Sequence, residues 1–402
     1  MGGDTEADIL MRAGVLEQIE PGIQAPNAEV IDVSGRVVLP GLIEAHCHLD
    51  KTLYGGEWVP HSAGDALSDR IDTERRRRGE LGVPNVDNIA ALLERMVAAG
   101  TTYVRTHTDI DPALGLSGVE AVQAAVDRLE SRITVEQVAF PQYGVLTNPG
   151  TAELLEEALK NGVGVIGGLD PAGIDRDPVR HLDVVFGLAE SYGAGIDIHL
   201  HDGGTLGTWQ LELIAERTAA TGLGGHVAVS HAYGLGQADE VTQERLAVRL
   251  AEAGVALVTA AVYDFPMPPI KKLRAAGVTV ACGHDGIRDL WGPYGSGDML
   301  ERAMHVAYRS TFRRDEDIEL ALEAASYGGA QLLGLNVYGL TPGAPADLVV
   351  VDARTPAEAV VTRPARDLVL KRGRVVARAG GVESDRAAGA SADAKDGNHH
   401  AR

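Results

Sequence analysis

The sequence predicts an α/β protein, built as a (β/α)8 TIM-like barrel with a small β-sandwich domain formed from both chain ends. Three observations carry this prediction. Helix-like and strand-like segments alternate along most of the chain, polar residues cluster directly after the strand-like segments, and further short strands lie near both termini. This many alternating units favour closure into a parallel barrel over an open sheet.

The alternation begins at about residue 87. The segment IAALLERMVAAG has helical spacing, ends at a glycine and is followed by the β-branched run TTYVRTHTD. The rhythm then repeats, with strand-like parts ITVEQVAF, VGVIGGLD, GIDIHLHD, HVAVSHA, VALVTAA and VTVACGHD. Hydrophobic residues make up 45% of the chain but aromatic residues only 4%, so the interior is expected to be aliphatic, as in most barrels.

The predicted domain boundaries follow from these segments. Residues 1–40 form the first part of the small β-domain, 41–335 the barrel, and 336–381 the second part of the β-domain. Residues 382–402 are small, polar and charged, which predicts a disordered tail.

Composition excludes several classes of function. The net charge of -21 leaves no basic excess for a nucleic acid, and the one basic run, 75–78, is flanked by acidic residues and indicates a solvated surface. No apolar stretch approaches the roughly 18 residues of a membrane span, and the N-terminus lacks the pattern of a signal peptide. The two cysteines form no CxxC pair. We therefore expect a cytoplasmic protein without nucleic-acid or membrane partners.

Histidines and carboxylates gather where the predicted strands end. His46 and His48 in EAHCHLDK are two residues apart, so both imidazoles lie on one side of an extended chain. Three further strand ends carry such residues: His199, His201, Asp202, His231, His284 and Asp285. Because each buried unpaired polar group costs about 1–3 kcal/mol, packing explains this pattern poorly. Two or more imidazoles converging at the carboxyl ends of barrel strands indicate a metal centre.

This pattern resembles the amidohydrolase superfamily over nearly the whole chain. The segments AFPQYG, GIDIHLHD, VSHAYG and CGHDGIRDLWGPYGSGDML are similar to the bacterial cytosine deaminase branch, which also contains hydrolases of triazine rings. The resemblance implies that one divalent zinc or iron ion is held by His46, His48, His199 and Asp285, and that His231 is catalytic. Such an ion lowers the pKa of its water towards about 7. Asp285 is then expected to take the proton, and His231 to orient the nucleophile or stabilise charge.

Further site residues follow from the same resemblance. Superfamily members with two metals carry a bridging lysine or carboxylate after strand four, and the neutral Gln142 stands near that point, which predicts a single metal ion. Gln142 instead resembles the branch's substrate-binding glutamine, with a structural hydrogen bond as the alternative. Lys51 in HLDK resembles the triazine-directed relatives, and Trp291 resembles a tryptophan that lines the pocket; a surface lysine and a core tryptophan are the alternatives.

The segment after His199 is expected to touch the substrate. Asp202 stands where cytosine deaminases carry a proton-shuttling glutamate, but its side chain is one methylene shorter, and His201 shares the strand face of His199. Two departures make cytosine itself doubtful as the substrate. Gly286 replaces an acidic residue that follows the metal-binding aspartate, and GGLDPAGID replaces an aromatic, histidine-bearing segment.

The sequence therefore predicts a metal-dependent hydrolase of C–N bonds in a small nitrogen heterocycle, most simply a deaminase with an altered substrate. One alternative is an amidase, a cyclic amidase or an amidohydrolase that releases an N-alkyl amine. Another is an inactive barrel that serves as a binding protein, against which the complete residue set argues. The sequence leaves homo-oligomerisation open.

Overall fold

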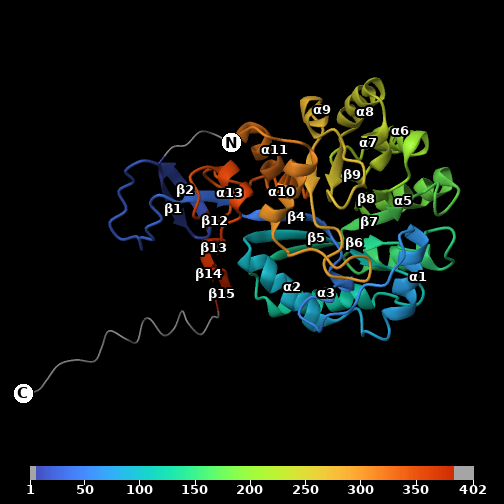
Figure 1. The fold of residues 1–402 in the computed structure, drawn as a ribbon, viewed down its shortest axis with the longest axis horizontal. Helices are drawn as coiled ribbons and strands as arrows, with labels where there is room; N and C mark the ends of the chain where they lie inside the picture. The colour runs from blue at the N-terminus through green and yellow to red at the C-terminus, as the bar shows by residue number, and fades with distance from the viewer. Residues whose placement is uncertain (1–5, 384–402) are drawn as a thin grey trace, which may run out of the picture.

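The computed structural model describes residues 6–383, and the alternating segments form a parallel barrel (Figure 1). Eight parallel strands are hydrogen-bonded in chain order. They are β4 (Leu42–Cys47), β5 (Thr101–Asp109), β6 (Thr134–Phe140), β7 (Val165–Leu169), β8 (Gly195–Leu200), β9 (Val227–His231), β10 (Val255–Thr259) and β11 (Val280–Cys282). The predicted (β/α)8 architecture is confirmed.

The end of the first strand, β4, meets the residues that follow the last strand, β11. A parallel bridge joins Cys47 to Asp285, the N–H of Asp285 donates to the carbonyl of His46 (2.9 Å), and the N–H of His48 donates to the carbonyl of Asp285 (3.3 Å). This junction closes the barrel at the carboxyl ends of its strands. It also sets the HxH pair directly beside Asp285, although more than 230 residues separate them.

Helices cover the outside of the barrel. They are α2 (Val86–Ala98), α3 (Ser117–Arg128), α4 (Thr151–Lys160), α5 (Pro178–Tyr192), α6 (Gly204–Thr221), α7 (Tyr233–Gln237), α8 (Glu240–Ala253), α9 (Ile270–Ala275), α10 (Met299–Arg309), α11 (Asp315–Ala324) and α12 (Tyr327–Leu332). The short η1 (Leu49–Lys51) and the helix α1 (Leu67–Arg77) lie in the long connection between β4 and α2. Side-chain caps begin several of these helices, such as Asn85 before α2 and Asp239 before α8.

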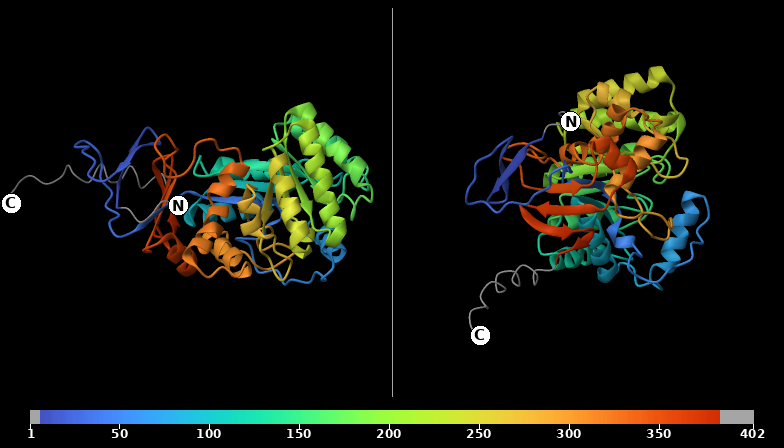
Figure 2. Two further views of the ribbon diagram at one scale, coloured as in Figure 1. Left: turned by 90° about the horizontal axis from the view of Figure 1, so that it is seen from above. Right: turned by 60° about the vertical axis from the view of Figure 1, so that its left-hand side comes forward.

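The two chain ends form a separate β-structure beside the barrel (Figure 2). A five-stranded sheet joins β3 (Val37–Pro40) to β12 (Leu348–Val351), β13 (Arg366–Lys371), β14 (Arg374–Arg378) and β15 (Gly381–Val382). A hairpin of β1 (Asp8–Arg12) and β2 (Val15–Glu20) attaches to it, because the N–H of Leu16 donates to the carbonyl of Ala344. A second hydrophobic core lies between them. The helix α13 (Pro356–Thr362) was not predicted.

The residue boundaries of the two domains stay predictions. Residues 382 and 383 continue the small sheet, and the remainder of the predicted tail lies outside the described residues. In the described part of the chain, no helix combines the length and apolar character needed to span a membrane.

The barrel interior changes in character along its axis. Near the amino ends of the strands it is filled by small apolar side chains such as Ala45, Ala228 and Ala256. Towards the carboxyl ends it becomes polar, with His107, Asp197 and other titratable residues fully buried. Barrel interiors are usually aliphatic, so this polar layer marks the end at which the chemistry is expected.

Candidate active site

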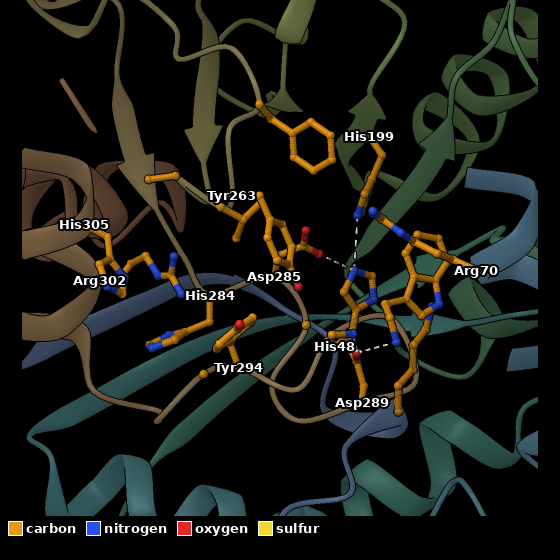
Figure 3. Close-up of a pocket in the computed structure, with 18 of the residues that line it drawn as sticks. His48, Arg70, His199, Tyr263, His284, Asp285, Asp289, Tyr294, Arg302 and His305 are labelled. Atoms are coloured by element: carbon orange, nitrogen blue, oxygen red, sulfur yellow. Dashed lines mark hydrogen bonds and ion pairs between the residues drawn. The ribbon is translucent and has the colours of Figure 1, made fainter. Parts of the chain in front are cut away.

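Four strand ends bring the predicted metal ligands and the predicted catalytic His231 together. His46 and His48 come from β4, His199 from β8, His231 from β9, and Asp285 from the loop after β11. One ligand atom from each of His46, His199, His231 and Asp285 lies within 4.8 Å of the others. His48 Nε2 is 3.3 Å from both His199 Nε2 and Asp285 Oδ1, and Figure 3 shows these three side chains pointing toward one another.

The backbone is strained at two of these positions. His231 has a φ of 73° and Asp285 a φ of 64°, a left-handed region that side-chain-bearing residues rarely adopt. Such conformations persist where the surrounding structure imposes them, and they cluster at functional sites. Here the bonds that close the barrel at His46 and His48 hold Asp285 in place.

Hydrogen bonds fix the tautomers of the HxH pair. His48 Nδ1 lies 3.0 Å from the carbonyl of His107, which can only accept, so Nδ1 carries the proton. His46 Nδ1 lies 2.8 Å from the Ser230 hydroxyl, and that hydroxyl donates to Asp197 Oδ1 (2.8 Å). Ser230 must therefore accept from His46. Both Nε2 lone pairs are directed into the centre, as is usual for metal-binding histidines with anchored Nδ1 atoms.

The donor set fits a divalent cation. Burial lowers the pKa of His48 to about 4 and those of His199 and His231 well below their ordinary value, so these imidazoles are neutral. Burial raises the pKa of Asp285, but in the metal-free site hydrogen bonds from protonated Nε2 atoms of His46 and His48 would lower it below its ordinary value. A carboxylate that faces imidazole lone pairs at 3.3 and 3.6 Å has no proton to share. A cation between them would turn this repulsion into coordination.

We predict that Ser230→Ala weakens metal binding by about 10- to 100-fold, the usual cost of removing an outer partner of a histidine ligand. Without the hydroxyl, His46 loses the acceptor that fixes its tautomer, and Asp197 loses one hydrogen-bond donor. Competition with a chromophoric chelator measures the affinity. Ser191→Ala, on the exposed face of α5, is the matched control, and equal affinities in the two variants would contradict the anchoring role.

A second group, His46, His107 and Asp197, also lies within metal-binding distance. It is less suited to a cation, because Asp197 already receives Ser230 and the guanidinium of Arg105 at 3.2 Å. His107 is fully buried, its ring centroid is 4.1 Å from that of His46, and neither ring nitrogen has a hydrogen-bond partner among the described residues, although Nε2 lies 3.8 Å from Asp197 Oδ2. Sequence reasoning did not single out His107, although it lies at a strand end like the others.

The position predicted for a metal-bridging residue requires a correction. Gln142 follows β6, the third barrel strand, and the residue after the fourth strand, β7, is Asp170. Asp170 Oδ1 accepts the N–H groups of His201 (2.5 Å) and Asp202 (3.0 Å), and Oδ2 lies 2.8 Å from His201 Nδ1. The one-metal interpretation therefore depends on Asp170 being committed to His201, and not on a neutral residue at that point.

His201 enters the cavity with a carboxylate behind it. Its ring stacks on that of His231, with centroids 4.5 Å apart and planes 24° from parallel. Burial lowers the pKa of His201, but the charge and hydrogen bond of Asp170 outweigh burial and raise it overall. Since Nδ1 is occupied by Asp170, Nε2 is the atom available for exchange of a proton with a ligand.

Asp202 is not brought into the cavity. Its Oδ2 accepts the N–H of Gly173 and the amide of Gln210, each at 2.9 Å. The strand alternation directs His199 and His201 inward, while Asp202 begins the turn into α6 and fixes the loop after β7. The sequence position resembled that of a proton-shuttling residue, but the side chain takes a different direction.

The predicted substrate-binding residues line one cavity of about 570 Å³ above the histidine cluster: Lys51, Gln142, His201 and Trp291. Lys51 Nζ donates to Gln142 Oε1 (2.5 Å) and lies 3.0 Å from Asp109 Oδ1. The indole N–H of Trp291 donates to Glu74, which reaches in from α1 and lies 3.5 Å from Lys51 Nζ. Neither Glu74 nor Asp109 was predicted, because sequence spacing gives no sign that they meet Lys51.

Lys51 is the cation of this buried group, and its removal should destabilise the fold. We predict that Lys51→Met lowers the free energy of unfolding by about 3–5 kcal/mol, since Asp109 and Glu74 would remain as buried, unpaired carboxylates. Chemical denaturation measures the loss. Lys51→Arg keeps the charge and should retain most of the stability, whereas equal losses in both variants would show that packing, and not charge, is responsible.

Comparison with known proteins agrees with this geometry. A model of the amidohydrolase family matches residues 82–377. N-isopropylammelide isopropyl amidohydrolase of Pseudomonas sp. (strain ADP) is 31% identical over 383 residues, covering 93% of this chain and 94% of that protein. The crystal structure of N-isopropylammelide isopropylaminohydrolase from Burkholderia multivorans is 46% identical, with a TM-score of 0.92 and coverage of 95% and 97% of the two chains. The 5-methylcytosine deaminase of Klebsiella pneumoniae is 25% identical, with a TM-score of 0.82 and coverage of 94% and 95%.

Proposed function

Because this chain belongs to the amidohydrolase family, we propose that it releases an amine from an N-substituted oxo-triazine or a closely related ring. The broader expectation from the sequence is confirmed: the protein is a hydrolase of non-peptide C–N bonds in nitrogen heterocycles, with likeness to cytosine deaminases and triazine-ring hydrolases. The release of an amine is the part that we propose. In this reaction water replaces an exocyclic N-alkylamino group by a carbonyl oxygen.

One observation carries the proposal. A buried cluster of histidines and a carboxylate opens onto one cavity, and the wall of that cavity carries the amide of Gln142 beside the ammonium of Lys51. Its volume of about 570 Å³ leaves room for a substituent beyond a bare six-membered ring. The relative that is 46% identical over nearly the full chain acts on such a substituted ring, whereas the cytosine-directed relative is 25% identical.

The metal site is part of the proposal. His46, His48, His199 and Asp285 would hold a single zinc or iron ion, which supplies a Lewis acid and lowers the pKa of a bound water. We propose one ion because both carboxylate oxygens of Asp170 are already hydrogen-bonded to His201 and Asp202. His231, which has no hydrogen-bond partner on either ring nitrogen among the described residues, would stabilise charge at the attacked carbon.

The remaining groups position the ring and move protons. The amide of Gln142, held by Lys51, would bind a ring oxygen or nitrogen, and Trp291 would pack against the ring face. We assign protonation of the leaving amine to His201, which is held by Asp170, in place of Asp202, whose carboxylate holds Gly173. Asp285 remains the proposed acceptor of the proton from water. Localisation in the cytoplasm also remains a proposal.

The test is turnover of metal-loaded enzyme on N-isopropylammelide, the same ring with a free amino group, cytosine and isocytosine. We expect isopropylamine from the first, detected by derivatisation, and a product that differs by exchange of the alkylamino group for oxygen. Ammonia from the free amino ring alone would make the enzyme a deaminase. A product heavier by one water would indicate ring opening. No turnover of any ring with metal confirmed would contradict the proposal.

A further inference from the structure

Asp289 lies in the loop between β11 and α10, four residues after Asp285, and only 6% of it is exposed. It lines the same cavity, and Figure 3 shows it beside His48. Its Oδ1 accepts the N–H groups of Trp291 (2.8 Å) and Gly292 (2.9 Å). These two bonds fix the carboxylate on the wall of the cavity.

The other oxygen of Asp289 has a defined place. A Cβ atom built on Gly286 would lie 2.2 Å from Asp289 Oδ2, so this oxygen occupies the space beside the residue that follows Asp285. No hydrogen bond to Oδ2 is found within residues 6–383. Burial raises the pKa of Asp289 to about 7, because the two backbone N–H groups and the charge of Lys51 offset only part of the lost hydration. When the carboxyl is ionised, as at pH 8, Oδ2 is therefore an acceptor without a hydrogen-bond partner on the wall of the cavity.

Gln142 supplies the opposite polarity in the same cavity. Its Oε1 already accepts the ammonium of Lys51 at 2.5 Å, so its amide N–H₂ group is left to donate, and Nε2 has no partner among the described residues. Lys51 itself is committed to Gln142, Asp109 and Glu74. Gln142 Nε2 is thus a donor and Asp289 Oδ2 an acceptor that both line the cavity without a hydrogen-bond partner among the described residues.

We propose that Asp289 determines specificity by accepting the N–H of a lactam edge, O=C–N–H, whose carbonyl oxygen is bound by Gln142. The preferred substrates are oxo-heterocycles with a ring N–H, and rings that present a bare nitrogen lone pair to Oδ2 are disfavoured by repulsion. The inference rests on the proposed function, since the lactam edge belongs to the ring that is hydrolysed. Gly286 is required because any side chain there would displace Oδ2.

Two isomers of equal size test this assignment by binding alone. 5,6-Dimethyluracil keeps both ring N–H groups, whereas 1,3-dimethyluracil has none. Calorimetric titration of metal-loaded enzyme at pH 8 should show the first ligand binding at least about 10-fold more tightly, as expected for a hydrogen bond to a charged group. Asp289→Asn keeps an oxygen for Trp291 and Gly292 but places an NH₂ donor at the Oδ2 position, so this variant should lose the discrimination.

Asp264→Asn is the matched control. Asp264 is exposed on the loop after β10 and is not part of the cavity lining, so this variant should discriminate like the unmodified enzyme. Two results for Asp289→Asn would overturn the assignment: the variant still distinguishes the two isomers, or its affinity falls equally for both. Equal binding of the two isomers to the unmodified enzyme, or no binding of either, would also overturn it. The binding test does not depend on turnover. If the enzyme distinguishes the two isomers but hydrolyses none of the rings, the proposed function is contradicted and the assignment of Asp289 is kept.

Discussion

Asp285→Ala should abolish amine release, with a loss of more than about 1000-fold in kcat/KM. The carboxylate is both a proposed metal ligand and the proposed acceptor of the proton from water, so two functions disappear together. Removing only an outer partner of a ligand costs about 10- to 100-fold, and a direct ligand should cost more. Metal content by atomic emission and amine release on N-isopropylammelide are the two measurements.

The two measurements separate the functions of Asp285. Retained activity in Asp285→Ala would refute both roles. Lost activity with full metal content would leave Asp285 as the proton acceptor only. Asp264→Ala removes an exposed carboxylate from the loop after β10 and serves as the control for a change of net charge.

Asp170→Asn should reduce kcat by about 1000-fold with a small change in KM. In the unmodified enzyme Asp170 Oδ2 accepts from His201 Nδ1, which leaves Nε2 free to exchange a proton in the cavity. An amide nitrogen at that position would donate to Nδ1 and force the proton onto Nε2. Replacement of an orienting aspartate by asparagine acts in this way in other aspartate–histidine pairs, with losses of up to about 10,000-fold.

Asp202→Asn distinguishes the two candidate routes for the proton. If Asp202 were the shuttle that its sequence position suggested, its amide variant would lose as much turnover as Asp170→Asn. We expect a loss below about 10-fold, because Asp202 Oδ2 contacts Gly173 and Gln210 outside the cavity. Metal content should stay unchanged in both variants, and a loss of metal from Asp170→Asn would instead indicate a structural effect on the centre.

Strand periodicity and barrel geometry predicted that histidines and carboxylates gather at the strand ends, and the resemblance to the amidohydrolase superfamily supplied the ligand set. His46 and His48 lie two apart on a strand, and the carboxyl ends of parallel strands converge on one face. The structure brings all four predicted ligands to one centre: His46, His48, His199 and Asp285. Lys51, Gln142, His201 and Trp291 also line the cavity above it.

Residues that depend on loop conformation were not predictable in the same way. Asp202 is three residues from His199, yet its direction is set by Gln210 on α6 and by the loop after β7. Glu74 enters from α1, inside a long connection whose sequence shows no strand-end pattern. Asp289 lies in a segment that the sequence did single out, but its proposed role depends on the space left by Gly286.

The sequence by itself determined the barrel, the contribution of both chain ends to a small β-structure, and the strand ends that carry the histidines, because periodicities of 2 and 3.6 residues are local properties. Apart from Asp285, which the sequence analysis named, only the tertiary structure decided which carboxylates lie beside the cavity residues. It assigned Asp170 to His201, turned Asp202 away, and gathered Glu74 and Asp109 around Lys51. These choices depend on which side chains meet across distant loops, where burial and hydrogen bonding, and not local spacing, set the partners of each charge.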